Sequence, residues 1–275
     1  MKKYLSIILA AVMAISVVLA FAGCSKTTDE PTEAADTDTS AAAVADVDAI
    51  KSAGKMVIGI TEYEPMNYKD AEGEWTGFDT EYAQAVCAKL GVEPEFVIID
   101  WDNKFLELDA KSIDCIWNGM TITDEVMNNS DVTNAYVKNA QVVVTTAEVK
   151  ANYTTLAEMT DLTFAAEAGS AGEVALKEAG ITPTAVVDQA SALMEVSSGT
   201  ADACVIDITM ANAMTGEGTS YESLVQVEEL AAEEYGIACR KGSDLTAEIN
   251  KLTDELKADG TMDKLAEKYE LTLVK

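Results

Sequence analysis

Residues 56–118, MVIGITEYEPMNYKDAEGEWTGFDTEYAQAVCAKLGVEPEFVIIDWDNKFLELDAKSIDCIWN, decide the fold. Short apolar runs of strand length lie at 56–61, 95–100 and 114–118, and amphipathic segments at 79–90 and 102–110 separate them. Strands that alternate with helices in this way predict a βαβαβ unit whose strands form a parallel sheet.

The segment 79–90 has the pattern of a helix that lies on such a sheet. Its apolar residues recur every three or four positions: Ala83, Val86, Cys87 and Leu90. Asp79 is a fitting N-cap, and Gly91 is placed to end the helix.

The same rhythm restarts after a strand at 141–146 and predicts a second α/β lobe. Strands are expected at 162–167, 184–188 and 202–207, with helices at 171–179 and 190–198. A further strand at 235–240 precedes two helices, one with a stripe of Leu245, Ile249, Leu252 and Leu256, the other with Met262, Leu265 and Tyr269. The chain is therefore expected to end in a helix, with one cleft between two lobes.

The first 46 residues predict export rather than folded structure. Lys2 and Lys3 precede an apolar run at 4–21, which is the layout of a secretory signal and is short for a membrane span of roughly 20 residues. Ala22 and Gly23 lead to Cys24, so residues 1–23 are expected to be cleaved as a signal peptide; the alternative is an uncleaved signal anchor. Residues 24–46 lack aromatic residues and predict a disordered tether.

Charge and composition exclude several classes of function. The 48 acidic residues face 19 basic ones, or 17 once Lys2 and Lys3 are cleaved, which leaves a net charge of −31 and disfavours nucleic acid as a partner. The chain has no histidine, which excludes Cys/His zinc sites and Ser-His or Cys-His nucleophiles, and no metal or other cofactor is expected. The remaining cysteines are interpreted as buried thiols, although spacing alone does not exclude a disulfide: Cys87, Cys115, Cys204 and Cys239.

Six motifs, in order and at matching spacing, resemble the polar amino-acid-binding proteins of ABC importers, bacterial solute-binding protein family 3. They begin at Tyr63-Glu64-Pro65, Gly77-Phe78-Asp79, Asp114, Ala168-Gly169-Ser170, Ala201-Asp202 and Tyr235-Gly236, and the likeness covers roughly residues 53–273. Phe21-Ala22-Gly23-Cys24 likewise resembles a bacterial lipobox, which implies diacylation of Cys24 and a lipid anchor in the cell membrane.

The resemblance implies the type II periplasmic-binding fold, in which two α/β lobes joined by two crossover strands close on a ligand by hinge motion. The crossovers are expected near Asn139–Val144 and Gly236–Arg240. The first lobe is then 47–141 plus 238–275, and the second is 142–237.

The resemblance also implies which residues contact the ligand. Tyr63 and Trp101 match aromatic walls, Asp207 matches the acid that pairs with the ligand α-ammonium, and Glu167 tends to face the ligand side chain. The matching polar positions are Asn118, Gly119 and Thr121 on the first lobe and Ser170, Ala171 and Gly172 on the second. The strand ends where several of them fall meet at one edge of an open sheet.

Each of these positions has a structural alternative. Both rings could belong to the core, and Asp207, Thr121 and Ser170 could cap the helices that follow them. Glu167 could be a solvated acid at a strand end.

One departure from the family bears on the ligand. The family motif continues Thr-x-x-Glu-Arg, and that arginine clamps the ligand carboxylate, whereas this chain has Thr123-Asp124-Glu125-Val126. Arg240, the only arginine, belongs to the returning crossover, which leaves Thr121, Asn118, the 170–172 amides and Lys138 as anion donors. Either these hold a carboxylate or the ligand has none; with Glu62 and Glu64 also nearby, a cationic or zwitterionic amine is favoured.

The predicted function is that of an extracytoplasmic, lipid-anchored, monomeric binding protein that presents an amino acid or related amine to the membrane permease of an ABC importer. Catalysis is not expected. The alternatives are a ligand-sensing module and a carboxylate-dependent lyase on the same fold.

Overall fold

The computed structural model describes residues 45–275, which lie within one compact unit, Ala41–Lys275. The predicted signal peptide, Cys24 and nearly all of the predicted tether lie outside the described residues. Within the described part of the chain, no helix has the length and apolar character that crossing a membrane requires.

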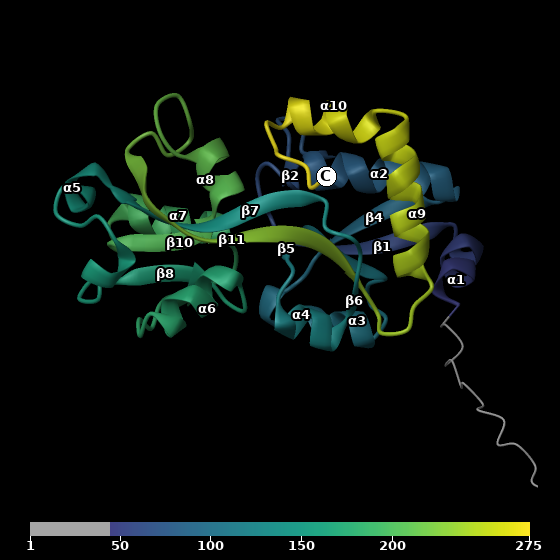
Figure 1. Ribbon diagram of the computed structural model, residues 1–275, viewed down its shortest axis with the longest axis horizontal. Helices are drawn as coiled ribbons and strands as arrows, with labels where there is room; N and C mark the ends of the chain where they lie inside the picture. The colour runs from purple at the N-terminus through teal and green to yellow at the C-terminus, as the bar shows by residue number, and fades with distance from the viewer. Residues whose placement is uncertain (1–44) are drawn as a thin grey trace, which may run out of the picture. The chain divides into compact units, whose positions relative to one another are not determined.

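A single mixed sheet runs through the described residues in the order β4-β1-β5-β11-β7-β10-β8-β9, and β6 pairs with β11 at its side. One half holds β1 (Lys55–Ile60), β4 (Glu93–Ile98) and β5 (Cys115–Thr121), which pair in parallel. The other half holds β8 (Phe164–Glu167), β9 (Thr184–Val186) and β10 (Ala203–Asp207), also parallel. These halves are called the first and the second lobe below, and Figure 1 shows them side by side.

Helices cover both faces of each lobe, as expected for buried parallel strands. In the first lobe, α2 (Phe78–Leu90), α9 (Leu245–Ala258) and α10 (Thr261–Lys268) contact one another, while α3 (Lys104–Asp109) contacts β5 and α4 (Asp124–Asn129) contacts β6 (Asp131–Val132). In the second lobe the sheet is covered by α6 (Ala171–Glu178), α7 (Gln189–Ser198) and α8 (Ile208–Met214). The smaller elements are α5 (Ala147–Lys150), the hairpin β2 (Tyr68–Lys69) and β3 (Trp75–Thr76), and the 3-10 turns Trp101–Asn103 and Leu156–Glu158.

Two long strands join the lobes. The antiparallel pair β7 (Val137–Thr146) and β11 (Leu224–Cys239) extends through both halves in Figure 1. In the second lobe β7 pairs with β10, and in the first β11 pairs with β5. This is the type II periplasmic-binding fold that the resemblance implied, and the exact lobe limits within these strands stay a prediction.

The strand β11 is much longer than the predicted 235–240. Its first part mixes apolar residues with acids in no regular alternation, and it is ordered by pairing with β7, with register shifts between Gln226 and Glu229 and between Glu229 and Ala232. Because this pairing is not local in the sequence, the composition of the segment does not reveal it.

Two expectations about helix ends were wrong. The second helix begins at Phe78 with Gly77 at its N-cap, and Asp79 is buried instead of capping the helix. The chain also does not end in a helix: after α10 it returns to the start of β7, where Lys138 N–H donates to the Thr272 carbonyl at 2.9 Å and Leu273 bridges Val137.

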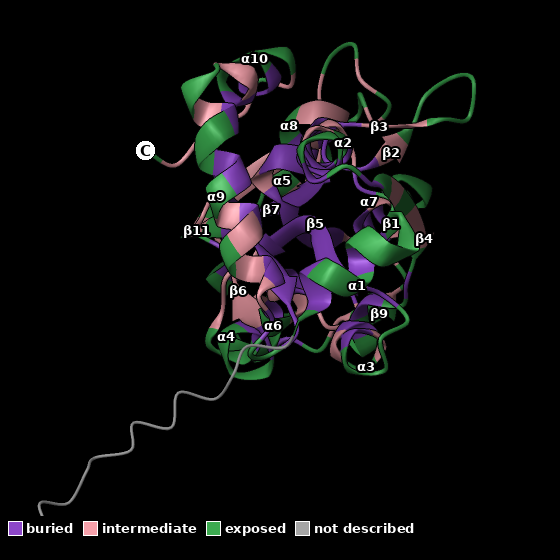
Figure 2. Cartoon of the chain, turned by 90° about the vertical axis from the view of Figure 1, so that its right-hand side faces the viewer, coloured by how far each residue is buried: buried purple, intermediate pink, exposed green. Residues whose placement is uncertain are grey.

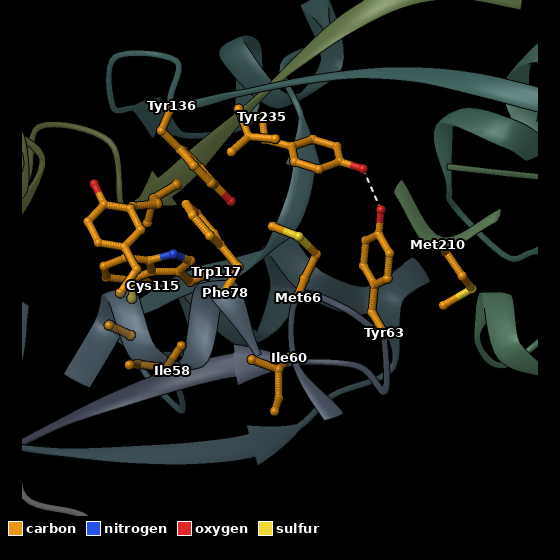
Figure 3. Packing of buried hydrophobic residues seen from close by; sticks show 14 of the residues in the cluster. Ile58, Ile60, Tyr63, Met66, Phe78, Cys115, Trp117, Tyr136, Met210 and Tyr235 are labelled. Atoms are coloured by element: carbon orange, nitrogen blue, oxygen red, sulfur yellow. Dashed lines mark hydrogen bonds between the residues drawn. The ribbon is translucent and has the colours of Figure 1, made fainter. Parts of the chain in front are cut away.

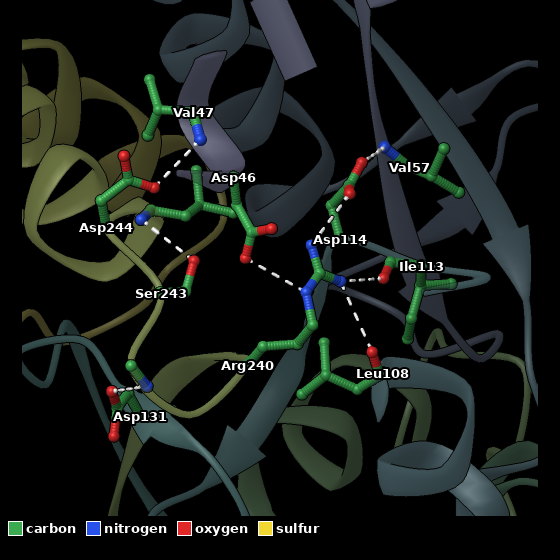
Figure 4. Close-up of polar contacts among 12 residues, drawn as sticks. Asp46, Val47, Val57, Leu108, Ile113, Asp114, Asp131, Arg240, Ser243 and Asp244 are labelled. Atoms are coloured by element: carbon green, nitrogen blue, oxygen red, sulfur yellow. Dashed lines mark hydrogen bonds and ion pairs between the residues drawn. The ribbon is translucent and has the colours of Figure 1, made fainter. Parts of the chain in front are cut away.

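The folded part starts one residue earlier than expected. Helix α1 (Asp46–Ala53) begins at Asp46, which was assigned to the tether but is buried. Its carboxylate accepts from Arg240 Nε at 3.1 Å, and Arg240 also donates to the Ile113 carbonyl at 2.7 Å and to Asp114 Oδ1 at 3.3 Å (Figure 4). This buried cluster joins the start of α1 to the end of β11.

The core follows the sheet. Figure 2 shows buried strands enclosed by helices whose outer faces are exposed. The predicted stripe residues of α9 and α10 are buried except Tyr269, which packs partly buried against the same core. All four described cysteines are buried and free, which confirms their interpretation as buried thiols.

Candidate functional site

A cavity of about 580 Å³ takes its lining from both lobes. The first lobe contributes the 101–104 turn, the end of β5 and the start of α4; the second contributes the ends of β8 and β10 and the start of α6. The two crossover strands supply Gln141 and Glu233. Because carboxyl ends of parallel strands from both lobes converge here, this is where a ligand of such a fold is expected.

A ladder of polar side chains runs across three neighbouring strands at the cavity. Asn139 and Gln141 lie two residues apart on β7 and so share a face; Glu233 of β11 lies opposite Asn139, and Asp207 of β10 lies opposite Gln141. Gln141 Nε2 donates to Asp207 Oδ1 at 2.6 Å and to Glu233 Oε2 at 3.0 Å. Sheet register therefore brings two carboxylates onto one amide group.

Asp207 is buried, and its carboxylate accepts hydrogen bonds from three side-chain amides, those of Asn139, Gln141 and Gln189. Loss of water, together with the negative charge of Glu233, raises the pKa of Asp207 to about 6, although the three donors oppose that rise. The carboxylate does not cap α8 through its side chain, so the N-cap alternative is not realised.

Glu167, at the end of β8, also lines the cavity and is only 3% exposed, so it is not a solvated strand-end acid. Its Oε1 has no hydrogen-bond partner among the described residues. Burial, and then the nearby Asp207 and Asp188, raise the pKa of Glu167 well above its usual range. A buried acid with an open acceptor atom faces the site.

Trp101 lines the cavity and at the same time packs with Leu108, Ile116 and Val126 in a buried cluster. The ammonium of Lys104 lies 5.1 Å from the centre of the Trp101 ring. Lys104 is buried and donates to the Trp101 carbonyl at 3.1 Å and, across the lobes, to the Gly169 carbonyl at 3.0 Å. Burial lowers the pKa of Lys104, and acids nearby, Glu125 and Glu167 first, oppose that change.

Asn118, Gly119 and Thr121 line the cavity as expected, but each is already engaged. Asn118 donates to Thr61 Oγ1 at 2.7 Å and accepts from Asn67 at 2.8 Å. The Gly119 N–H donates to the buried Asp79 at 2.6 Å, so this amide is not free for a ligand. Thr121 Oγ1 donates to Glu233 at 2.9 Å and does not cap α4, which Thr123 caps.

Of the three residues predicted to contact the ligand at the start of α6, two line the cavity and one does not. Ser170 and Ala171 line the cavity, and Ser170 Oγ accepts from the Glu173 N–H at 3.1 Å as the helix N-cap. Gly172 does not line the cavity: a Cβ there would lie 2.7 Å from the Val205 carbonyl, so glycine allows α6 to approach β10. The Glu173 carboxylate accepts from the Gly169 N–H at 3.0 Å and already places a negative charge at this helix start.

Tyr63 does not line the cavity. It is 1% exposed, and Figure 3 shows its hydroxyl directed at that of Tyr235, with which it forms a hydrogen bond. The same hydroxyl meets Thr209 Oγ1 of the second lobe at 2.5 Å. Trp101 is therefore the one predicted aromatic wall that the structure brings to the cavity.

The cavity also contains the position of the missing arginine. Val126 lines it and is 4% exposed. Lys138 is exposed beside a different cavity. Arg240 is held by Asp46 and Asp114, and neither Glu62 nor Glu64 reaches the cavity.

The polar residues of the site that sequence reasoning missed include Lys104, Gln141, Gln189 and Glu233. A signal existed for Gln141, since Asn139 and Gln141 interrupt an otherwise apolar strand at alternate positions. Glu233 lies in an acid-rich run, where no single acid stands out.

Residues 56–272 match the family model for bacterial extracellular solute-binding proteins, family 3. The L-cystine-binding protein TcyJ of Escherichia coli K12 is 29% identical over 228 residues, which cover 80% of this chain and 84% of that protein. A mutant of ArgBP from T. maritima superimposes with a TM-score of 0.76 at 32% identity, covering 81% of this chain and 98% of that one.

A third similar protein is AncCDT-1, an ancestral amino-acid-binding protein and precursor of cyclohexadienyl dehydratase. Its TM-score is 0.76 at 31% identity, and the match covers 82% of this chain and 99% of that one. The family match spans most of the chain, and the motifs, the sheet order and the cavity between the lobes agree with it. The chain belongs to the bacterial extracellular solute-binding proteins, family 3.

Proposed function

We propose that the protein is the extracytoplasmic substrate-binding component of an ABC importer and that its lobes close around an amino acid or a related amine. The observation that carries this proposal is the cavity itself, whose walls come from both lobes and from both crossover strands. A ligand held there would contact both lobes at once and so favour their closure.

The functions of similar proteins support the class of ligand. TcyJ is named for L-cystine, and AncCDT-1 is described as an amino-acid-binding protein. The buried Asp207 and its neighbour Glu233 suit a ligand ammonium, which carries N–H donors and a positive charge.

The other contacts follow from the site. Trp101 would form the wall for the ligand side chain, and Glu167 would form a polar contact with the end of that side chain. Thr121, Ser170 and the Ala171 amide would complete the polar contacts, while Asn118 and Gly119 shape the floor. Tyr63 and Gly172 would support the site from behind, through Thr209 and Val205 respectively.

We further propose that a lipid on Cys24 anchors the mature chain to the cell membrane after cleavage of residues 1–23. The tether then spans 24–45, and the monomer presents its ligand to a permease in the same membrane. A flexible coil of this length reaches roughly 25 Å, which keeps the cavity near that permease. Metabolic labelling with a radioactive fatty acid, compared with Cys24→Ser, tests the anchor; equal label in both would contradict it.

A thermal-shift screen tests the binding function. Amino acids, polyamines and short peptides are added to the soluble chain that starts at residue 25, and a true ligand raises the melting temperature by mass action. The shift should shrink in Asp207→Asn. If no compound of the three classes raised the melting temperature, the result would count heavily against the proposal.

A carboxylate-dependent lyase is the second candidate, because AncCDT-1 is a precursor of a dehydratase and because Glu167 and Asp207 are buried acids with raised pKa. Such acids suit proton transfer. We favour binding without turnover, and prolonged incubation of a bound ligand, followed by NMR, tests this directly: an unchanged ligand is expected.

A further inference from the structure

The lining of the cavity between the lobes is strongly unbalanced in charge. It contains six acidic side chains and, among the described residues, one basic side chain. The acids are Asp124, Glu125, Glu167, Glu178, Asp207 and Glu233. A ligand carboxylate would enter this field against repulsion, whereas a cation would be attracted.

The one cation of the lining has little donor capacity left for a ligand carboxylate. Lys104 Nζ donates to two backbone carbonyls, those of Trp101 and Gly169, at 3.1 and 3.0 Å. A lysine ammonium has three N–H groups, so two of its three directions are already used inside the protein. No arginine lines the cavity, because Arg240 lies in the buried cluster at the far end of the first lobe.

The start of α6 is a weak substitute. The Ser170 hydroxyl and the Glu173 carboxylate already hold the Glu173 and Gly169 amides, and the Glu173 charge lies where an anionic ligand would benefit from the helix dipole. The nearby buried Glu167 adds a further acid.

Acceptors for two ammonium groups are present instead. The first is the pair Asp207 and Glu233, held side by side by Gln141. The second is Glu167, which lines the cavity and whose buried Oε1 has no hydrogen-bond partner among the described residues, a costly state that an N–H donor would relieve. Between the polar groups, Trp101, Met120, Val126 and Leu156 offer apolar walls that suit methylene groups.

We propose that the ligand is a small aliphatic diamine without a carboxylate. One ammonium binds at Asp207 and Glu233 and the other at Glu167. This inference rests on the proposed binding function and narrows its ligand class.

The experiment compares amines with the amino acids that differ from them only by a carboxylate. Calorimetry at pH 7.5 measures 1,5-diaminopentane against L-lysine, and 1,4-diaminobutane against L-ornithine, with the chain that starts at residue 25. We expect each diamine to bind at least tenfold more tightly than its amino acid. An amino acid that binds equally or more tightly would overturn the inference while leaving the binding function intact.

Two variants sharpen the test. Glu167→Gln should weaken the diamines at least tenfold, whereas Glu178→Gln, at an exposed acid of the same lining, should change them less than threefold. A similar loss of diamine affinity in both variants would contradict the assignment of Glu167.

Val126→Arg provides the opposite change, since it restores a cation to the cavity wall. This variant should bind L-lysine more tightly relative to 1,5-diaminopentane than the wild type does. No heat from any of the four probes, with intact thermal unfolding, would overturn the diamine inference. The wider binding function would then depend on the thermal-shift screen.

Discussion

The Lys104 ammonium lies 3.0 Å from the Gly169 carbonyl oxygen and thereby joins α3 of the first lobe to the loop before α6 of the second. This contact and that of Tyr63 with Thr209 link the lobes directly. Both place a first-lobe side chain against the second lobe, so each favours the arrangement in which the cavity is enclosed.

Lys104→Met should open the ligand-free protein. A hydrogen bond from a charged donor is worth about 1.5–3 kcal/mol, enough to change the ratio of two arrangements about tenfold or more. Small-angle X-ray scattering should therefore report a larger radius of gyration for the variant. Lys89→Met is the matched control, since Lys89 contacts only Glu255 and Asp259 of its own lobe. Equal radii for all three proteins would contradict the prediction.

Asp207→Asn should weaken an ammonium ligand by about 2 kcal/mol, roughly thirtyfold, because it removes the charge that faces the ligand. Calorimetry with the ligand from the thermal-shift screen measures the loss. Asp202 lies just before the start of β10, bonds Thr163 and does not line the cavity, so the affinity of Asp202→Asn should stay within twofold of wild type. A similar loss in both variants would point to general damage.

Stability and affinity should depend on pH in opposite ways. In the folded protein the pKa is about 6 for Asp207 and about 7 for Asp79, against 3.8 in an unfolded chain. The folded state thus binds these protons more tightly, and the stability from both groups is full below pH 3.8 and lost as pH rises through 6 to 7.

Chemical denaturation of the ligand-free protein should accordingly show higher stability at pH 5.5 than at pH 8. The pKa values of Asp46, Glu81 and Glu173 are lowered, so their contribution to the stability of the folded protein is lost only at more acidic pH. Affinity for a cation should instead fall as the pH is lowered over the same interval, because Asp207 gains a proton and loses its negative charge. Parallel trends in the two measurements would contradict this account.

Arg240→Met should destabilise the first lobe by about 3 kcal/mol, because it leaves the Asp46 carboxylate buried without its partner and removes a donor from the Ile113 carbonyl. Urea unfolding measures the change. Lys55→Met is the control: its ion pair with Glu95 is about half exposed and should contribute less than about 1 kcal/mol. Similar losses in both would show that burial of the Arg240 cluster is unimportant.

The sequence predicted those parts of the fold that depend on local pattern. The apolar stripes of α9 and the short strands β1, β8 and β10 lie close to where periodicity placed them. The first part of β11 could not be found, because it lacks a regular apolar alternation and is ordered by distant pairing with β7. Distant contacts also explain why Asp79 looked like an N-cap. Its hydrogen-bond partners, Gly119 and Tyr136, are 40 and 57 residues away in the sequence.

The sequence likewise indicates some residues of the candidate site and not others. Asp207, Glu167 and Trp101 could be named because strand ends and family motifs mark them. Lys104 could not, since its two carbonyl partners become neighbours only when the lobes meet. The ladder from Glu233 to Asp207 depends on the register of three strands, and register is a property of the assembled sheet.

The pairing of Asp46 with Arg240 also has a mechanical consequence. Asp46 is the first residue of α1, and Arg240 directly follows the strand that crosses both lobes. Val47 N–H is in turn held by Asp244, just before α9, at 3.0 Å. A pull on the chain before Asp46 is therefore resisted first by a buried ion pair and a helix start, so the load enters the first lobe through α1 and the residue that follows β11.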